Sequence, residues 1–270
     1  MPEAATEWSD VLTRPLLLTV TASRVARSVV LYRLSRERDA WVTPDEIGRF
    51  IQESVGWAPS EDTLYNGILA TLRGKERVPK GGARQEPVVN VKALKGGENH
   101  RWTAYQINTA GLALLGEERS KLIGPGAPLS AALHGLQHLA GVIGRYASPA
   151  ESMVTNLNVL LRWLVLHTLM ELGPSSVPAI ATYAYGCAGQ ISFVPQGGVV
   201  MERWPRDEVI RRAVGELQDE RHKLFGVQKG GTIVTITETG ELLYERWKPH
   251  LSQAVARGIR FAQGAISLLE

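Results

Sequence analysis

The stretch 105–115, YQINTAGLALL, and the stretch 234–243, VTITETGELL, follow the same pattern. Aligned on their isoleucines, both have strand-type residues, then an amide or hydroxyl side chain, and then a glycine four positions after the isoleucine that opens a leucine-bearing helical start. An amphipathic stretch opening near a proline precedes each copy, near Pro59 and near Pro205. The copies lie about 130 residues apart, whereas solenoid repeats have periods of about 20–50 residues. The chain is therefore predicted to contain a domain duplication.

The first copy ends a series of helix and strand signals. Thr43 can cap a helix whose first position is proline, and Glu46 completes a capping box three residues later. After a short turn containing glycine, Ser60 caps the next amphipathic stretch. In chain order the predicted elements are helices at residues 23–38, 44–54 and 60–72, hairpin strands at residues 88–94 and 101–107, and a helix from residue 109.

The second copy has the same order with one departure. The predicted elements are helices at residues 154–172, 176–185 and 205–217, hairpin strands at residues 225–228 and 232–237, and a last helix at residues 241–270 that is broken or bent at Pro249. About 17 residues, from Cys187 to Arg203, replace the tight turn between the second and third helices. They include a strand-type run at residues 191–194, and they break the helix-turn-helix geometry that the first copy keeps.

Helix, capped helix, short turn, helix and hairpin form the outline of a winged helix, and this outline occurs twice. The predicted fold is α+β and mostly α, with two tandem winged-helix domains, a helical linker and a C-terminal helix. The predicted boundaries are a tail at 1–14, a first domain at 15–120, a linker at 121–150, a second domain at 151–248 and a terminal helix at 249–270.

Positive charge gathers in one part of the chain. Residues 73–101 hold eight lysines and arginines against three glutamates, an excess larger than the net charge of +3 for all 270 residues. Such a local excess is typical of a surface that binds polyanions, although a merely solvated loop has the same composition.

Composition excludes several other classes of protein. The single cysteine, Cys187, rules out an internal disulfide framework and suits a reducing cytoplasm. The most apolar stretch, residues 157–172, is shorter than a membrane span and contains charged residues. His134 and His138 have a spacing that can bind a metal, but neither the glutamate of a zinc protease nor a third ligand accompanies them. We therefore expect no catalysis, cofactor, metal or membrane insertion.

Two motifs link the chain to known regulators. Thr63-Leu64-Tyr65 on the third helix and Tyr105-x-Ile107-x-x-x-Gly111 after the hairpin resemble the PadR and MarR families of winged-helix transcriptional regulators, although Asn108 replaces the usual threonine. The resemblance covers about residues 20–118 and, more loosely, 154–248. It implies that helix 60–72 enters the major groove of double-stranded DNA and that the basic wing contacts phosphates.

The resemblance also implies which residues contact DNA. On the third helix and in the basic stretch these are Ser60, Thr63, Tyr65, Asn66, Lys75, Lys80, Arg84, Lys92, Lys95 and Arg101. Asn66 is suited to pair with adenine through two hydrogen bonds. A possible second DNA site comprises Arg206, Arg211, Arg212 and Lys229, but acidic residues lie between them, so the second domain is equally a candidate for dimerisation or for binding a protein partner.

The chain is thus predicted to be a sequence-specific transcriptional regulator in the cytoplasm, associated with the nucleoid. We expect a homodimer formed through helix 129–146 or the C-terminal helix, which would place two readers about one DNA turn apart. Two alternatives stay open. One is a plasmid or phage replication or partition protein. The other is a protein-interaction subunit of a chromosome-organising complex, since tandem winged helices serve there too.

Overall fold

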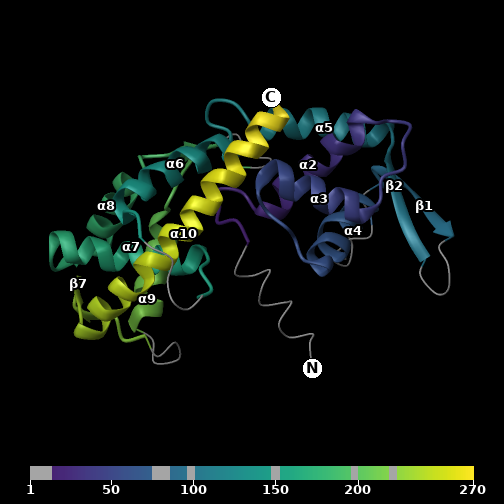
Figure 1. Ribbon diagram of the computed structural model, residues 1–270. Coiled ribbons are helices and arrows are strands. Elements are labelled where there is room, and N and C mark those ends of the chain that lie inside the picture. Colours follow the sequence, from purple (N-terminus) through teal and green to yellow (C-terminus); the bar gives the residue numbers. More distant parts are fainter. Residues whose placement is uncertain (1–13, 75–85, 96–100, 147–152, 196–199, 219–223) are drawn as a thin grey trace, which may run out of the picture. The chain divides into compact units, whose positions relative to one another are not determined.

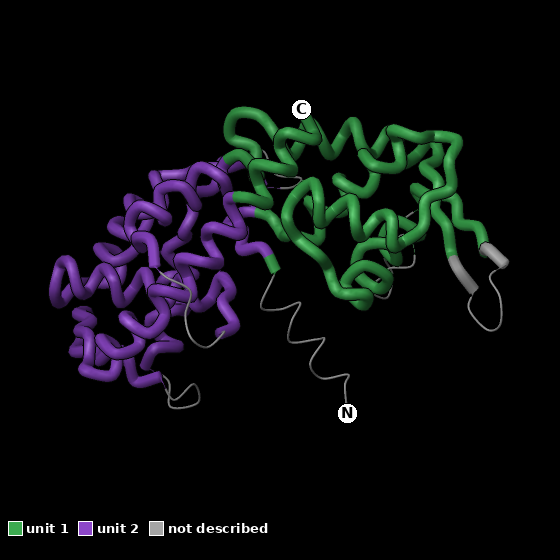
Figure 2. The backbone as a smooth tube through the Cα atoms, in the orientation of Figure 1, with its two compact units in different colours: residues 1–14, 20–130, 260–270 green, residues 15–19, 131–259 purple. Residues whose placement is uncertain are grey.

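The computed structural model describes residues 14–74, 86–95, 101–146, 153–195, 200–218 and 224–270 (Figure 1). In these ranges the fold is mostly helical α+β with small antiparallel sheets. The chain forms two compact units, coloured separately in Figure 2. Unit 1 comprises Met1–Arg14, Val20–Ser130 and Arg260–Glu270, and unit 2 comprises Pro15–Thr19 and Ala131–Ile259.

Unit 1 has the element order expected from the sequence. Its elements are α2 (Ala22–Arg36), α3 (Pro44–Val55), the π-helix η1 (Thr63–Leu69), α4 (Ala70–Leu72), β1 (Val89–Lys95), β2 (Arg101–Ile107) and α5 (Thr109–Leu122). The capping box at Thr43 is confirmed, because its hydroxyl accepts from the Glu46 N–H while the Glu46 carboxylate accepts from the Thr43 N–H at 2.7 Å. These hydrogen bonds also lower the pKa of Glu46.

The third helix differs from the expected α-helix. Its middle, η1, is a π-helix, in which each N–H bonds to the carbonyl five residues earlier, as Ala70 does with Tyr65. With this hydrogen bonding, Leu64 and Leu69 lie one turn apart, and both are buried. Ile68 is buried with them in the core of unit 1.

The hairpin β1–β2 is joined to the helices through the link between α2 and α3. The strands pair in register from Val89 opposite Ile107 to Lys95 opposite Arg101. Val42, in that link, exchanges two backbone hydrogen bonds with Tyr105 of β2, at 2.8 and 2.9 Å. The hairpin therefore has a defined position against the three helices that precede it.

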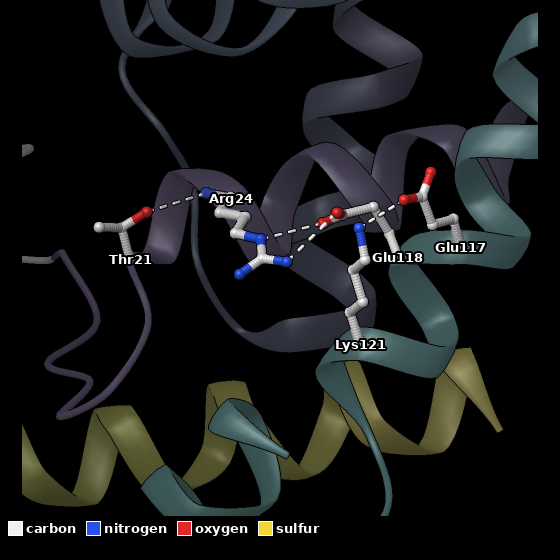
Figure 3. Close-up of polar contacts among 5 residues, drawn as sticks. All are labelled: Thr21, Arg24, Glu117, Glu118 and Lys121. Carbon is white, nitrogen blue, oxygen red and sulfur yellow. Dashed lines mark hydrogen bonds and ion pairs between the residues drawn. The ribbon is translucent and has the colours of Figure 1, made fainter. Parts of the chain in front are cut away.

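A nearly buried ion pair joins α2 to α5 (Figure 3). The Arg24 guanidinium donates to both carboxylate oxygens of Glu118, at 3.0 and 3.2 Å, and the two side chains are only 8% and 12% exposed. Thr21 caps α2 beside this pair, and Glu117 and Lys121 form a separate ion pair on the exposed side of α5. The paired geometry satisfies charges that would be costly to bury alone.

Unit 2 repeats the order of helices and strands with one insertion. Its elements are most of α6 (Pro128–Ile143), then α7 (Leu157–Leu172), β3 (Ser175–Ser176), α8 (Val177–Cys187), β4 (Ser192–Phe193), β5 (Glu202–Arg203), α9 (Asp207–Gln218), β6 (Val227–Gly230), β7 (Ile233–Ile236) and the first part of α10 (Glu238–Leu269). The short hairpin β4–β5 occupies the insertion that the sequence placed between the second and third helices. None of the helices in the described ranges is long and apolar enough to span a membrane.

The last helix corrects half of one prediction, which was a break or bend at Pro249. α10 is one helix from Glu238 to Leu269 with Pro249 inside it, so the break does not occur. Trp247 and Leu251, on either side of the proline, are buried. Burial of such side chains offsets the roughly 3 kcal/mol that an interior proline costs a helix. Residues 249–270 are thus the second half of α10 rather than a separate helix.

Both helices expected to form a dimer are packed within the chain itself. In α6, Leu136, Leu139 and Ile143 are buried. Near the end of α10, Phe261 makes an edge-to-face contact with Trp57 at 5.8 Å between ring centroids, within unit 1. The homodimer stays a prediction, and a face other than these buried sides would have to form it.

A stack of rings forms part of the core of unit 2. The His167 ring is parallel to that of Trp163, with centroids 4.9 Å apart, and Tyr244 stacks on Trp163 at 5.4 Å. The Tyr244 hydroxyl lies 3.3 Å from His167 Nδ1. Burial lowers the pKa of His167 below its usual value, and the Lys248 charge acts in the same direction while Glu171 opposes both.

We expect unit 2 to lose stability in mild acid because of His167. Its pKa is lowered in the folded state, so the unfolded chain binds the proton more readily and stability falls as the pH drops below about 6.5. The measurement is the melting temperature at pH about 7.5 and about 5.5 for the wild type and for His167→Gln, which cannot titrate. The variant should lose less between the two pH values, and an equal loss in both proteins would contradict this role.

Candidate nucleic-acid interface

The hairpin β1–β2 of unit 1 and the hairpin β6–β7 of unit 2 pair in the same way with an earlier segment of their own unit. In unit 1, Val42 pairs with Tyr105 of the hairpin's second strand. In unit 2, Ser175 of β3 pairs with Val234 of β7. Tyr105 and Val234 are matched positions when the two sequence stretches are aligned on their isoleucines. The strand pairing therefore repeats residue for residue.

The residue after each isoleucine makes the same pair of contacts. Asn108 accepts a hydrogen bond from the Gly111 N–H at 2.9 Å, and its amide donates to the carbonyl two residues before β1. Thr237 accepts from the Gly240 N–H at 3.1 Å, and its hydroxyl donates to the carbonyl two residues before β6. Asparagine thus performs in unit 1 what threonine performs in unit 2.

The shared glycine lets the following helix approach the hairpin closely. A Cβ at Gly111 would lie 2.2 Å from the Val88 carbonyl oxygen, and a Cβ at Gly240 would lie 2.0 Å from that of Gly226. Any side chain at either position would displace backbone. The repeated sequence pattern is therefore the joint that holds each hairpin on its helices.

The third helix of unit 1 exposes few of the residues expected to contact DNA. Ser60 caps the helix, and Thr63 is buried, with the two hydroxyls 3.2 Å apart. Tyr65 is half-buried, and burial followed by the nearby Asp45 raises its pKa. Asn66 is exposed, and its amide donates to Asp62 one turn earlier at 2.6 Å. Asn66 is thus the expected base reader that this helix presents most openly.

The basic hairpin is described in part. Lys92 is exposed on β1, and its ammonium lies 5.6 Å from the ring centroid of Trp41, within range of a cation–π contact. Lys95 and Arg101 are paired at the far end of the hairpin, and their side chains lie outside the described part of the structure. Lys75, Lys80 and Arg84 lie outside the described residues.

Sequence reasoning missed the positions of two residues near this surface. Trp41 is 37% exposed beside Lys92, and its place directly before the buried Val42 and the Thr43 cap was the available signal. Arg73 opens the basic stretch but turns inward, half-buried, with its guanidinium 6.0 Å from the Tyr105 ring centroid. Arg73 therefore supports the hairpin and contributes little charge to the surface.

The four residues of the possible second site are all exposed in unit 2. Arg206 precedes α9, Arg211 and Arg212 lie on it, and Lys229 lies on β6. Arg206 forms an ion pair with Glu202 at 3.4 Å. The backbone ties helix and hairpin together, because the Gly226 N–H donates to the Leu217 carbonyl at 2.9 Å.

The described residues hold no group of three or more histidine, cysteine or acidic side chains that could bind a metal. His134 and His138 lie side by side, with ring centroids 4.6 Å apart, and His134 Nε2 is 3.3 Å from the Gly189 carbonyl oxygen. Burial raises the pKa of Cys187 to about 11, so its thiol stays protonated at neutral pH.

Comparisons of the chain with protein-family models, with curated proteins and with solved structures found no match.

Proposed function

We propose that the chain is a sequence-specific double-stranded DNA-binding protein made of two tandem winged helices and acting as a transcriptional regulator. The observation that carries this proposal is the assembly in unit 1. A capped helix pair precedes a hairpin that is joined to the helices through Val42, and the hairpin carries Lys92. Helix followed by a charged hairpin is the arrangement with which winged helices bind a groove and the adjoining phosphates.

We assign base reading and phosphate binding to different side chains according to their chemistry. Asn66 reads a base edge in the major groove, because a carboxamide matches the donor and acceptor of adenine. Lys92, with Lys95 and Arg101, neutralises phosphates and supplies affinity for any sequence. Glu61 and Asp62 are exposed at the start of the helix, so the contacts concentrate at Asn66 and beyond.

The test is selection of bound duplexes from a random pool, repeated at about 50 and about 200 mM salt. We expect an enriched motif that persists at the higher salt. Asn66→Ala should relax the preference at one base pair, at a cost of about 1–3 kcal/mol in discrimination. Gln137→Ala, which removes an exposed amide from α6, is the matched control and should leave the motif unchanged. Absence of enrichment at both salt concentrations would refute the proposal.

One observation favours a second candidate, a protein-interaction role for unit 2. Val194, Val200 and Met201 beside the inserted hairpin β4–β5 are exposed, with Val200 73% accessible. Apolar side chains at an inserted hairpin suit contact with another protein. A chain that binds no duplex would bring this candidate to first place.

A further inference from the structure

The outward side of α9 exposes arginines whose balance against nearby acidic residues the sequence alone left open. The helix buries Ile210, Ala213, Val214 and Leu217 in unit 2 and exposes Arg211 and Arg212. It occupies, in the order of elements, the place that η1 and α4 occupy in unit 1. Acidic residues on or near α9 would cancel this charge if they had no other partners.

Three acidic residues on or just before α9 are paired with other arginines. Asp207 accepts from Arg203 at 3.1 Å, and Glu202 pairs with Arg206 at 3.4 Å. A third, Glu216, lies 2.7 Å from the guanidinium of Arg162 on α7, with both side chains at most 20% exposed. These three carboxylates are therefore bound to arginines other than Arg211 and Arg212.

Arg211, Arg212 and Lys229 take part in no ion pair among the residues that the structure describes. Of the acidic residues on α9, Glu208 alone has no described partner. Among the described residues of α9 and β6, three exposed cations therefore stand against one carboxylate without a described partner. Lys229 belongs to the hairpin that the Gly226 to Leu217 hydrogen bond attaches to the end of α9.

We propose that Arg211, Arg212 and Lys229 form a second duplex-DNA contact that binds phosphates and adds affinity without reading sequence. Guanidinium groups bind phosphate oxygens through two hydrogen bonds, which suits a pair of adjacent exposed arginines. Between α8 and α9 the β4–β5 insertion replaces the tight turn of unit 1, so unit 2 lacks the short connection that a helix-turn-helix base reader has. This inference rests on the proposed DNA-binding function and assigns unit 2 to the same ligand.

The experiment measures the affinity of the full chain for its selected duplex as a function of salt. Arg211→Ala/Arg212→Ala removes two phosphate contacts, so the slope of log K against log salt should become shallower by about 1.8. Between about 50 and about 200 mM salt, the variant should therefore lose about tenfold less affinity than the wild type. The selected motif should stay the same, because phosphate contacts carry no sequence information.

Two control variants test whether the effect depends on the position of the arginines and on their charge. Arg145→Ala/Arg246→Ala removes two exposed arginines elsewhere in unit 2 and should keep the wild-type slope. Arg211→Lys/Arg212→Lys keeps the charge and should restore most of the slope.

Three outcomes would overturn the inference. In the first, Arg211→Ala/Arg212→Ala keeps the wild-type salt slope while a hairpin variant of unit 1 has a shallower one. Unit 2 is then not a DNA contact, and the proposed function stands. If the alanine pair changes the motif, α9 reads bases and the phosphate assignment is wrong. A wild type that binds no duplex would refute both proposals together.

Discussion

Replacing Lys92, Lys95 and Arg101 together by alanine is expected to weaken binding to every duplex by about a hundredfold near physiological salt. The three cations belong to one hairpin, and Lys95 is paired directly with Arg101 across it. Loss of three phosphate contacts should make the salt slope shallower by about 2.7. Affinity for the selected motif and for a scrambled duplex should fall by the same factor, because phosphates are shared by all sequences.

The matched control for the hairpin removes the same charge elsewhere. Lys121→Ala/Arg145→Ala/Arg246→Ala takes three exposed cations from α5, from the segment just after α6 and from α10. This control should keep the wild-type affinity and slope within about twofold. An equal loss in both triple variants would mean that overall charge, rather than the hairpin, attracts DNA.

Gly240→Ala is expected to destabilise unit 2 by about 3 kcal/mol or more, because overpacking against fixed backbone is among the costliest single substitutions. The added Cβ would lie 2.0 Å from the Gly226 carbonyl oxygen and 2.8 Å from Ile236 Cγ1. The carbonyl cannot move freely, since it accepts the Thr237 N–H at 3.1 Å while the Gly226 N–H bonds to Leu217. Thermal unfolding should shift down by about 6–12 °C.

The control for this substitution is Gly230→Ala on the same hairpin. Gly230 is exposed and has no atom within 4 Å of an added Cβ, so its melting temperature should change little. Gly111→Ala should repeat the large loss in unit 1, where the Cβ would meet the Val88 carbonyl at 2.2 Å. If Gly240→Ala melts like Gly230→Ala, the shared glycine is not the joint between hairpin and helix.

Local chemistry explains why much of the fold could be predicted. The Thr43 capping box and the Ser60 cap each depend on residues three positions apart, so their partners can be read from the chain itself. The hairpins followed from strand-type runs separated by turn residues, and the matched glycines followed from comparing the two halves. The order of helices and strands in both units could therefore be predicted from the sequence.

The candidate site was less accessible to sequence reasoning. Ser60 and Thr63 carry hydroxyls suited to DNA, but one caps the helix and the other is buried, because the same groups also satisfy helix ends and cores. The exposed place of Asn66 agrees with the spacing of the buried residues around it. Trp41 lies beside Lys92 because the hairpin pairs with the link that contains Val42, and this tertiary contact cannot be read from the local sequence.

The sequence by itself indicated the repeated motif, and it determined the caps, the hairpins and the basic stretch, since each of these depends on neighbours along the chain. The tertiary structure decided that α10 runs through Pro249, that the third helix widens into a π-helix, and that Glu216 pairs with Arg162 instead of cancelling the charge of α9. The physical reason is the same in each case. Burial and ion pairing depend on which distant residues meet, and their free energies outweigh local helix preferences and the spacing of charges along one helix.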